Sequence, residues 1–150
     1  MIPGETLFVD TNILIYSTNN LSVWHVPAER MLDSARLQGI SLIISPQIIR
    51  EYISVFSRGI RVIPKIKTDG LLKNLDLLRT SFILVDENRE VIFHLIELLR
   101  EIPIIGKQIH DANIVATMMA HGVSRLLTHN TKDFERYAGL ITVVPLLEGE

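Results

Sequence analysis

The sequence contains no cysteine and no long apolar run. The missing cysteine excludes disulfide frameworks, thiolate zinc sites, iron–sulfur clusters and a cysteine nucleophile together. No apolar run approaches the roughly 18 residues that a membrane-spanning helix needs. The first residues, MIPGETLFVD, also lack the basic start of a secretory signal. We therefore expect a cytoplasmic protein that does not enter a membrane.

A strong net charge is also missing. The 15 lysines and arginines nearly balance the 17 acidic residues, which gives a net charge of -2. Such a chain has no global attraction to nucleic acid, so any binding must depend on a local basic patch or on a metal ion. Hydrophobic residues make up 47% of the sequence, enough for a sizeable core. The length of 150 residues predicts a single domain over residues 1–150.

Short apolar runs alternate with helical patterns from end to end. The runs are 6–9, 41–44, 82–85, 125–128 and 141–144, and helices are expected from Pro27 to before Gly39 and over 46–58, 68–79, 88–100 and 109–121. The runs are nearly continuous in apolar residues, which is typical of parallel strands covered on both faces. This order predicts an α/β fold, a three-layer α/β/α sandwich with a parallel five-stranded sheet.

Acidic and polar residues follow two of the predicted strands. Asp10 comes directly after the first strand, and the polar stretch Thr128–Asp133 follows the fourth. Ligands of open α/β sheets bind beyond the carboxyl ends of the strands. Asp10 on its own is equally typical of a turn or of a helix N-cap.

Two further acids lie on predicted helices. Asp111 shares a helix face with Ile114, Val115 and Met118, where a carboxylate is costly to bury unless amides, a cation or a metal compensate it. The alternative for Asp111 is a cap at the positive end of its helix. Glu51 borders an apolar helix face, where a solvated boundary residue is the simpler interpretation.

The combination of these acids favours a metal site. Asp10, Glu51 and Asp111 each lie within about a turn of a strand end, at the same edge of the predicted sheet. Oxygen ligands without thiolates suit hard cations such as Mg²⁺ or Mn²⁺. Such a metal would bind a phosphate oxygen and lower the pKa of a bound water. No glycine-rich phosphate loop is present. The sequence therefore predicts a divalent-metal-dependent nuclease.

Cations and rings near these acids are candidates for substrate contacts. A stretch without acidic residues supplies four cations for phosphate contacts, with a solvated turn as the alternative: Arg58, Arg61, Lys65 and Lys67. His129 follows the fourth strand and could contact substrate, whereas His110 is expected only to orient its neighbour Asp111. Trp24 is expected to be a packing residue rather than a base-stacking platform.

Four motifs in this order resemble those of PIN-domain proteins. They are FVDTNIL over residues 8–14, Glu51-Tyr52, IHDA over residues 109–112 and LTHNTKDF over residues 127–134. The likeness covers essentially the whole chain, and the length is most similar to VapC-like toxins of prokaryotic toxin–antitoxin pairs. The resemblance implies strand order 3-2-1-4-5, Mg²⁺- or Mn²⁺-dependent ribonuclease activity on an RNA substrate, a homodimer, and a small antitoxin that covers the site.

The resemblance also implies roles for individual residues. Asp10 and Asp111 match the principal metal ligands, and Glu51 would complete the acidic pocket directly or through water. Many members have an aspartate where this chain has Asn130, so either Asn130 or Asp133 fills the fourth position, and the number of metals stays open. The supporting residues that order the ligand loop and strand end are Thr11, Asn12 and Thr128.

Two other classes of function compete with this interpretation. A phosphatase with Asp10 as nucleophile needs a second aspartate two residues later, where this chain has Asn12, and the acid pair of a receiver domain is also missing. A non-catalytic PIN-like binding domain would be expected to have lost one of the first three acids, and all three are present. The RNA target and the dimer surface stay open, and the apolar stretch 103–105 fits either an interface or the core.

Overall fold

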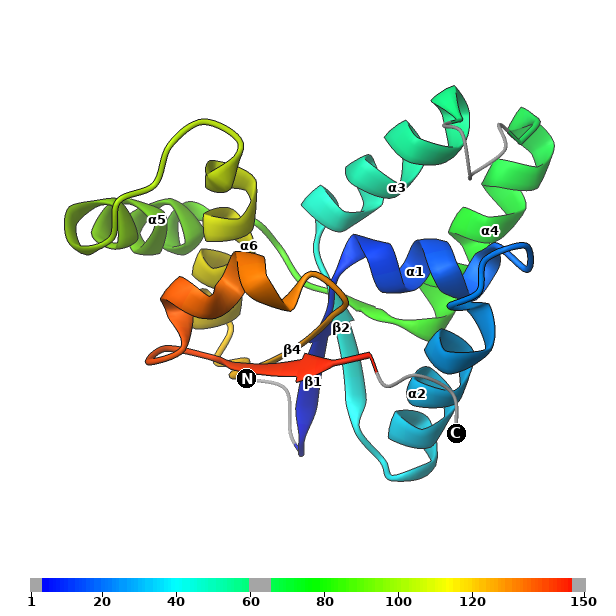
Figure 1. Cartoon of the computed structure of the whole chain (residues 1–150), viewed down its shortest axis with the longest axis horizontal. Coiled ribbons are helices and arrows are strands. Elements are labelled where there is room, and N and C mark those ends of the chain that lie inside the picture. Colours follow the sequence, from blue (N-terminus) through cyan, green and yellow to red (C-terminus); the bar gives the residue numbers. More distant parts are fainter. Residues whose placement is uncertain (1–3, 60–65, 147–150) are drawn as a thin grey trace.

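The computed structural model describes residues 4–59 and 66–146 and contains one five-stranded parallel sheet (Figure 1). Its order is β3-β2-β1-β4-β5, which confirms the predicted fold class and strand order. The strands are β1 (Thr6–Val9), β2 (Ser41–Ile44), β3 (Ile83–Leu84), β4 (Arg125–Thr128) and β5 (Thr142–Pro145). Two of the predicted cations, Arg61 and Lys65, lie outside the described residues.

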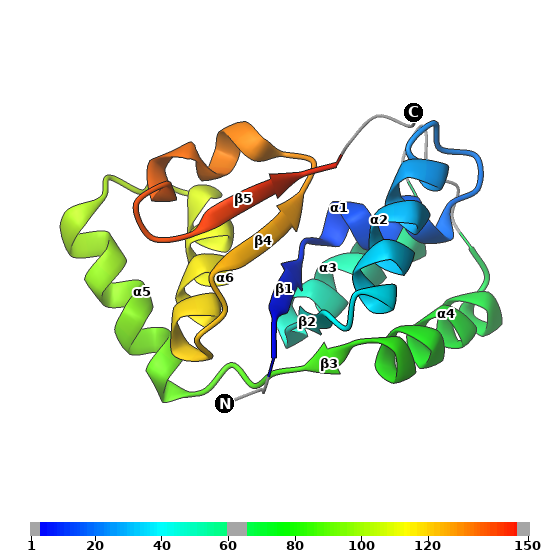
Figure 2. The same ribbon diagram turned by 90° about the horizontal axis from the view of Figure 1, so that it is seen from below.

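Seven helical segments connect the strands in the described part of the chain. They are α1 (Thr11–Thr18), α2 (His25–Leu37), α3 (Pro46–Arg58), α4 (Thr68–Ser81), α5 (Arg89–Glu101), α6 (Gln108–Ala120) and the 3₁₀ helix η1 (Thr131–Tyr137). Helices α1 to α4 lie on one side of the sheet, whereas α5 and α6 lie on the other (Figures 1 and 2). Within residues 4–59 and 66–146, no helix combines the length and the apolar character that crossing a membrane requires.

The centre of the sheet is buried and apolar, as the apolar strand sequences predict. Phe8 of β1 pairs with Ile43 of β2 on one side and with Leu126 of β4 on the other. All three side chains are fully buried. Strands covered on both faces in this way place their carboxyl ends at one edge of the sheet, where β1 and β4 are neighbours.

The structure differs from the sequence prediction in four places. Residues 11–18 form helix α1 and residues 131–137 form η1, two segments for which no helix was predicted. Helix α2 begins at His25, two residues before Pro27. Strand β3 is only Ile83–Leu84, at the sheet edge with both side chains exposed, whereas the flanking residues Phe82 and Val85 are buried.

Candidate functional site

Asp10 lies where the sheet meets α1. Its backbone N–H donates to the carbonyl oxygen of Leu127 (3.0 Å), so the pairing of β1 with β4 continues to this residue. The side chain is the N-cap of α1, and one carboxylate oxygen accepts from the Thr11 N–H (2.7 Å). The other accepts from the Thr128 hydroxyl (2.8 Å) and the Asn12 amide (3.2 Å). Asp10 is therefore the N-cap of α1, and these hydrogen bonds hold its carboxylate at the end of β1.

Burial makes the charge on Asp10 costly. The residue is only 6% exposed, and this burial raises the pKa of its carboxyl from 3.8 to about 6. The nearby charge of Glu51 raises this pKa further, whereas the hydrogen bonds from Thr128, Thr11 and Asn12 lower it. A cation beside Asp10 would relieve this cost.

The three supporting residues predicted from the sequence surround Asp10. The Thr11 hydroxyl donates to a carboxylate oxygen of Glu51 (3.2 Å), which links α1 to α3. The Asn12 amide also donates to the Thr128 hydroxyl (3.3 Å), and its carbonyl oxygen accepts from the His129 N–H (3.1 Å). These bonds hold the start of α1 against the end of β4.

Glu51 is oriented by Gln47, a residue that the sequence prediction missed. The Gln47 amide donates to Glu51 (2.8 Å) and to the carbonyl oxygen of His110 (2.8 Å). Its own carbonyl oxygen accepts from the amide of Asn113 (2.7 Å). Gln47 is 5% exposed and one helical turn before Glu51, so it joins α3 to α6 through a buried polar network. The spacing of four residues between a glutamine and a glutamate was the only signal in the sequence.

Asp111 lies in the first turn of α6 without a protein partner. Its half-buried carboxylate forms no hydrogen bond or ion pair with any described residue, and the N-cap of α6 is Lys107, so Asp111 is not the cap. The pKa of the Asp111 carboxyl is raised to about 7, mainly by burial and also by the charges of Asp10, Asp133 and Glu51. Arg136 lowers it. Asp111 therefore experiences the charge of every predicted acid of the site.

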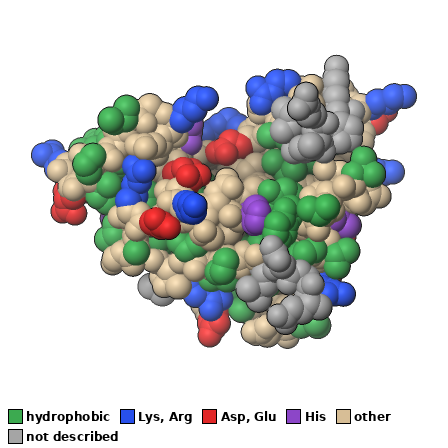
Figure 3. Space-filling model, viewed as in Figure 1, with side chains coloured by type: hydrophobic (Ala, Val, Ile, Leu, Met, Phe, Trp, Pro, Cys, Tyr) green, Lys and Arg blue, Asp and Glu red, His purple; other side chains and the backbone are tan. Residues whose placement is uncertain are grey.

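The candidates for the fourth position differ in their coupling to this cluster. Asp133, exposed in the first turn of η1, acts on the pKa of Asp111. Asn130 is exposed; its backbone N–H donates to the Thr128 hydroxyl (3.1 Å), and its carbonyl oxygen accepts from the Asp133 N–H (3.2 Å). The choice between Asp133 and Asn130 stays a prediction. Figure 3 shows acidic side chains near the middle of this face, with a histidine and hydrophobic side chains beside them.

Of the four predicted cations, Arg58 and Lys67 lie within the described residues. Arg58 is seven residues beyond Glu51 on α3, which is about 10 Å along the helix axis. Lys67 immediately precedes α4. The cation whose charge reaches the acids is instead Arg136 of η1, which also donates to the carbonyl oxygen of Pro103 (3.3 Å). The side chain of His110 is exposed, and this residue contributes its carbonyl oxygen to the Gln47 network.

Four acids belong to the candidate site, and their carboxylate oxygens fit a hard cation: Asp10, Glu51, Asp111 and Asp133. Within residues 4–59 and 66–146, however, no three histidine or acidic side chains come close enough together to form a ready-made metal site. The charge of Glu51 still raises the pKa of Asp10, the charges of Asp10, Asp133 and Glu51 raise that of Asp111, and the Asp111 carboxylate has no hydrogen-bond partner among the described residues. Carboxylates arranged in this way suit Mg²⁺ or Mn²⁺, and binding would require the side chains to draw closer.

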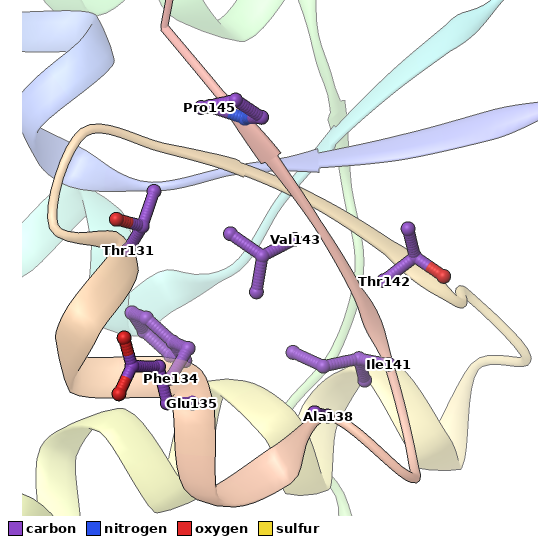
Figure 4. Close-up of a pocket in the computed structure, with 8 residues that line it drawn as sticks. All are labelled: Thr131, Phe134, Glu135, Ala138, Ile141, Thr142, Val143 and Pro145. Atoms are coloured by element: carbon purple, nitrogen blue, oxygen red, sulfur yellow. The ribbon is translucent and has the colours of Figure 1, made fainter.

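A separate cavity lies between η1 and β5. Its volume is about 490 Å³, and Figure 4 shows the apolar side chains of Phe134, Ile141 and Val143 around it. None of the four acids lines it. This cavity is therefore distinct from the acidic site.

Comparisons with known proteins address the family directly. The profile of the PIN-domain family matches residues 7–140, whereas the comparison with curated proteins gives no match. Among solved structures, the chain is similar to VapBC2 from Rickettsia felis bound to a DNA fragment from its promoter (22% identity, TM-score 0.69, covering 93% of this chain and 98% of that chain). It is also similar to a toxin–antitoxin complex from Klebsiella pneumoniae (23% identity, TM-score 0.65, 95% and 99%). A third similar structure is VapC20 from Mycobacterium tuberculosis, a toxin that cleaves the sarcin-ricin loop (15% identity, TM-score 0.67, 91% and 96%).

At these identities the solved structures show the fold, and the family profile carries the assignment. The match from residue 7 to residue 140 includes β1, β4 and all four acids. It confirms the resemblance seen in the sequence motifs. The protein belongs to the PIN-domain family, a family of nucleases.

Proposed function

We propose that this PIN-domain protein is a Mg²⁺- or Mn²⁺-dependent endoribonuclease. The observation that carries the proposal is that the charges of Asp10, Glu51 and Asp133 all act on the carboxyl of Asp111. Repulsion between these carboxylates is unfavourable in the metal-free protein, and a bound divalent cation would neutralise it.

Each acid has a defined part in this proposal. Asp10 and Asp111 would hold the cation, Glu51 would complete the pocket directly or through water, and Asp133 or Asn130 would fill the fourth position. A bound divalent cation supplies a Lewis acid for the phosphate and lowers the pKa of a water molecule. The chain itself contributes a preorganised Asp10, whose carboxylate already accepts three hydrogen bonds.

The partners follow from the same similarity. Similar structures include VapBC assemblies, and this chain covers nearly their whole toxin-like chains, 98% in the Rickettsia felis case. We therefore propose a cytoplasmic toxin of a toxin–antitoxin pair, with residues 1–150 as a single nuclease domain. Its partners would be an RNA substrate, a small antitoxin over the acidic site and a second copy in a homodimer.

An RNA cleavage assay tests the activity. Labelled structured and single-stranded RNAs are incubated with Mg²⁺, Mn²⁺ or chelator, beside the variants Asp10→Asn and Asp111→Asn. Asp33→Asn is the matched control, because Asp33 is 66% exposed on α2 and forms an exposed ion pair with Arg36. We expect metal-dependent cleavage by the wild type and the control, and none by the two site variants.

Two outcomes would contradict the proposal. Cleavage that is equal in all variants would point to a contaminating nuclease. RNA binding without cleavage under any metal condition would favour the alternative, a non-catalytic PIN-like binding domain.

A further inference from the structure

Three aromatic rings gather beside the acidic site. Tyr16 comes from α1, Trp24 immediately precedes α2, and His129 follows β4. The ring centroids of Trp24 and His129 are 4.2 Å apart, and those of Tyr16 and His129 are 5.6 Å apart with the rings nearly perpendicular. All three side chains are half-buried, so each keeps part of its ring in solvent. We call these three residues the aromatic cluster.

Two successive hydrogen bonds connect the aromatic cluster to Asp10. The His129 N–H donates to the Asn12 side chain (3.1 Å), and the Asn12 amide donates to Asp10 (3.2 Å). Tyr16 follows Asn12 by four residues, so both lie on the same face of α1. The pKa of the Tyr16 hydroxyl is raised by burial and also by the charge of Asp10. The rings therefore stand at the rim of the acidic site.

Backbone contacts hold the aromatic cluster in place. The ring of His25 donates through Nδ1 to the carbonyl oxygen of Tyr16 (2.8 Å), and its Nε2 contacts the carboxylate of Glu29. The Trp24 N–H donates to the Ser22 hydroxyl (3.1 Å). Rings that are ordered before a ligand arrives lower the entropic cost of binding it.

We propose that the aromatic cluster is a nucleobase subsite, which stacks one base of single-stranded RNA next to the phosphate held at the acids. The proposal rests on the proposed ribonuclease function. Proteins bind unpaired bases by stacking them on aromatic rings, and stacking is tolerant of sequence. With a net charge of -2, the protein has no global attraction to the RNA backbone, and the acids of the site repel phosphate when no metal is bound. Contact with an uncharged base is then a favourable interaction that this rim can offer.

The single tryptophan makes this subsite directly observable. Trp24 is the only tryptophan of the chain, so its fluorescence reports on the aromatic cluster alone. The probe is a single-stranded hexaribonucleotide, titrated in chelator so that metal-dependent cleavage is absent. Matched hexamers carry one abasic ribose, moved along the chain position by position. We expect saturable quenching by the intact RNA, and at one position the missing base should weaken binding by about tenfold or more.

Variants separate stacking from general damage. Trp24→Ala and His129→Ala should each weaken binding of a fluorescently labelled hexamer by about tenfold, whereas Trp24→Phe keeps a ring and most of the affinity. The control is Phe93→Ala, because Phe93 is an aromatic residue of α5 that is 54% exposed and outside the aromatic cluster. In the cleavage assay the two alanine variants should raise KM and leave kcat little changed. Thermal melting establishes that each variant is folded.

Several results would overturn the proposal. They are no quenching at all, equal quenching by intact and abasic RNA, or losses in the alanine variants no larger than in Phe93→Ala. Quenching that follows the protein concentration instead of the RNA would mean that another protein copy covers the rings, and it would also overturn the proposal. Base-dependent quenching without any cleavage would keep the subsite and refute the nuclease function. Cleavage of RNA without base-dependent quenching would keep the nuclease function and refute the subsite.

Discussion

Replacing Asp10 by asparagine should stabilise the metal-free protein. Burial raises the pKa of the Asp10 carboxyl from 3.8 to about 6, so the folded state favours the protonated form. A group of this kind stabilises the fold fully below its unfolded pKa, and the contribution is lost as the pH rises through the folded pKa. The Asp10 carboxylate therefore costs the fold about 3 kcal/mol at pH 7.5, at about 1.36 kcal/mol for each tenfold change in the acidity constant.

Asparagine has nearly the same shape and no charge. Its carbonyl oxygen can still accept from the Thr11 N–H, whereas its NH₂ group cannot accept from Thr128 or Asn12, a loss of about 1 kcal/mol. We therefore expect Asp10→Asn to raise the free energy of unfolding by about 2 kcal/mol at pH 7.5 in chelator. The difference should shrink as the pH falls, reach zero at about pH 4.5 and reverse below it, because the charge cost disappears when wild-type Asp10 is protonated and the hydrogen-bond loss stays.

Urea denaturation in chelator at several pH values measures this difference. Asp33→Asn is the control, and its exposed ion pair predicts a change below about 0.5 kcal/mol. Adding Mg²⁺ should stabilise the wild type by about 2.7 kcal/mol at a concentration of 100 Kd and leave Asp10→Asn unchanged. The reasoning is refuted if Asp10→Asn is less stable than the wild type at pH 7.5 by an amount that does not vary with pH.

Three further predictions concern the surroundings of the site. Gln47→Met should lower kcat, because it removes the donor that orients Glu51. It should also destabilise the fold by about 1–3 kcal/mol, because it leaves buried polar groups unpaired. Kinetics and urea denaturation measure the two effects, and an unchanged kcat would contradict the positioning role. Tyr52→Phe should lower the free energy of unfolding by about 1–2 kcal/mol, because the buried Tyr52 hydroxyl bonds to two side chains. Tyr137→Phe should lower it by less than about 0.5 kcal/mol, because the Tyr137 hydroxyl has no partner among the described residues. Equal losses in urea denaturation would contradict this contrast. The affinity for Mn²⁺, measured by calorimetry, should rise between pH 5.5 and 7.5, because protons compete with the metal for the Asp111 carboxyl, whose pKa is raised. An affinity that does not depend on pH would contradict the role of this carboxyl as a ligand.

The fold was largely predictable because its strands are short, apolar and clearly bounded. The predicted bounds of β1, β2 and β4 match the structure, since all three are buried on both faces. Helix α1 was missed because Ile13, Leu14 and Ile15 are consecutive buried residues, which gives no helical period and reads like a strand or loop. Edge strand β3 was predicted too long because the flanking Phe82 and Val85 are also apolar and are buried, although the strand itself is only Ile83–Leu84.

The site was only partly predictable. The sequence indicated Asp10 and Asp111 because acids at a strand end or on an apolar helix face are unusual, and the structure places them within electrostatic reach of each other. Gln47 was missed because one of its partners is the backbone carbonyl oxygen of His110, which leaves no trace in residue types. Trp24 was predicted to be a packing residue, and it does pack, but its partner His129 is distant in sequence and only the fold shows that the rings stand beside the acids.

Binding of Mn²⁺ to the purified protein tests the central claim most directly, because the proposed function requires a divalent cation that is held principally by Asp10 and Asp111. Electron paramagnetic resonance of Mn²⁺ titrated into the wild type, Asp10→Asn, Asp111→Asn and the control Asp33→Asn gives the number of ions bound per chain. We predict saturable binding by the wild type and the control, and a loss of binding in Asp10→Asn and Asp111→Asn. Equal binding by all four proteins, or no binding by the wild type at millimolar Mn²⁺, would contradict the claim.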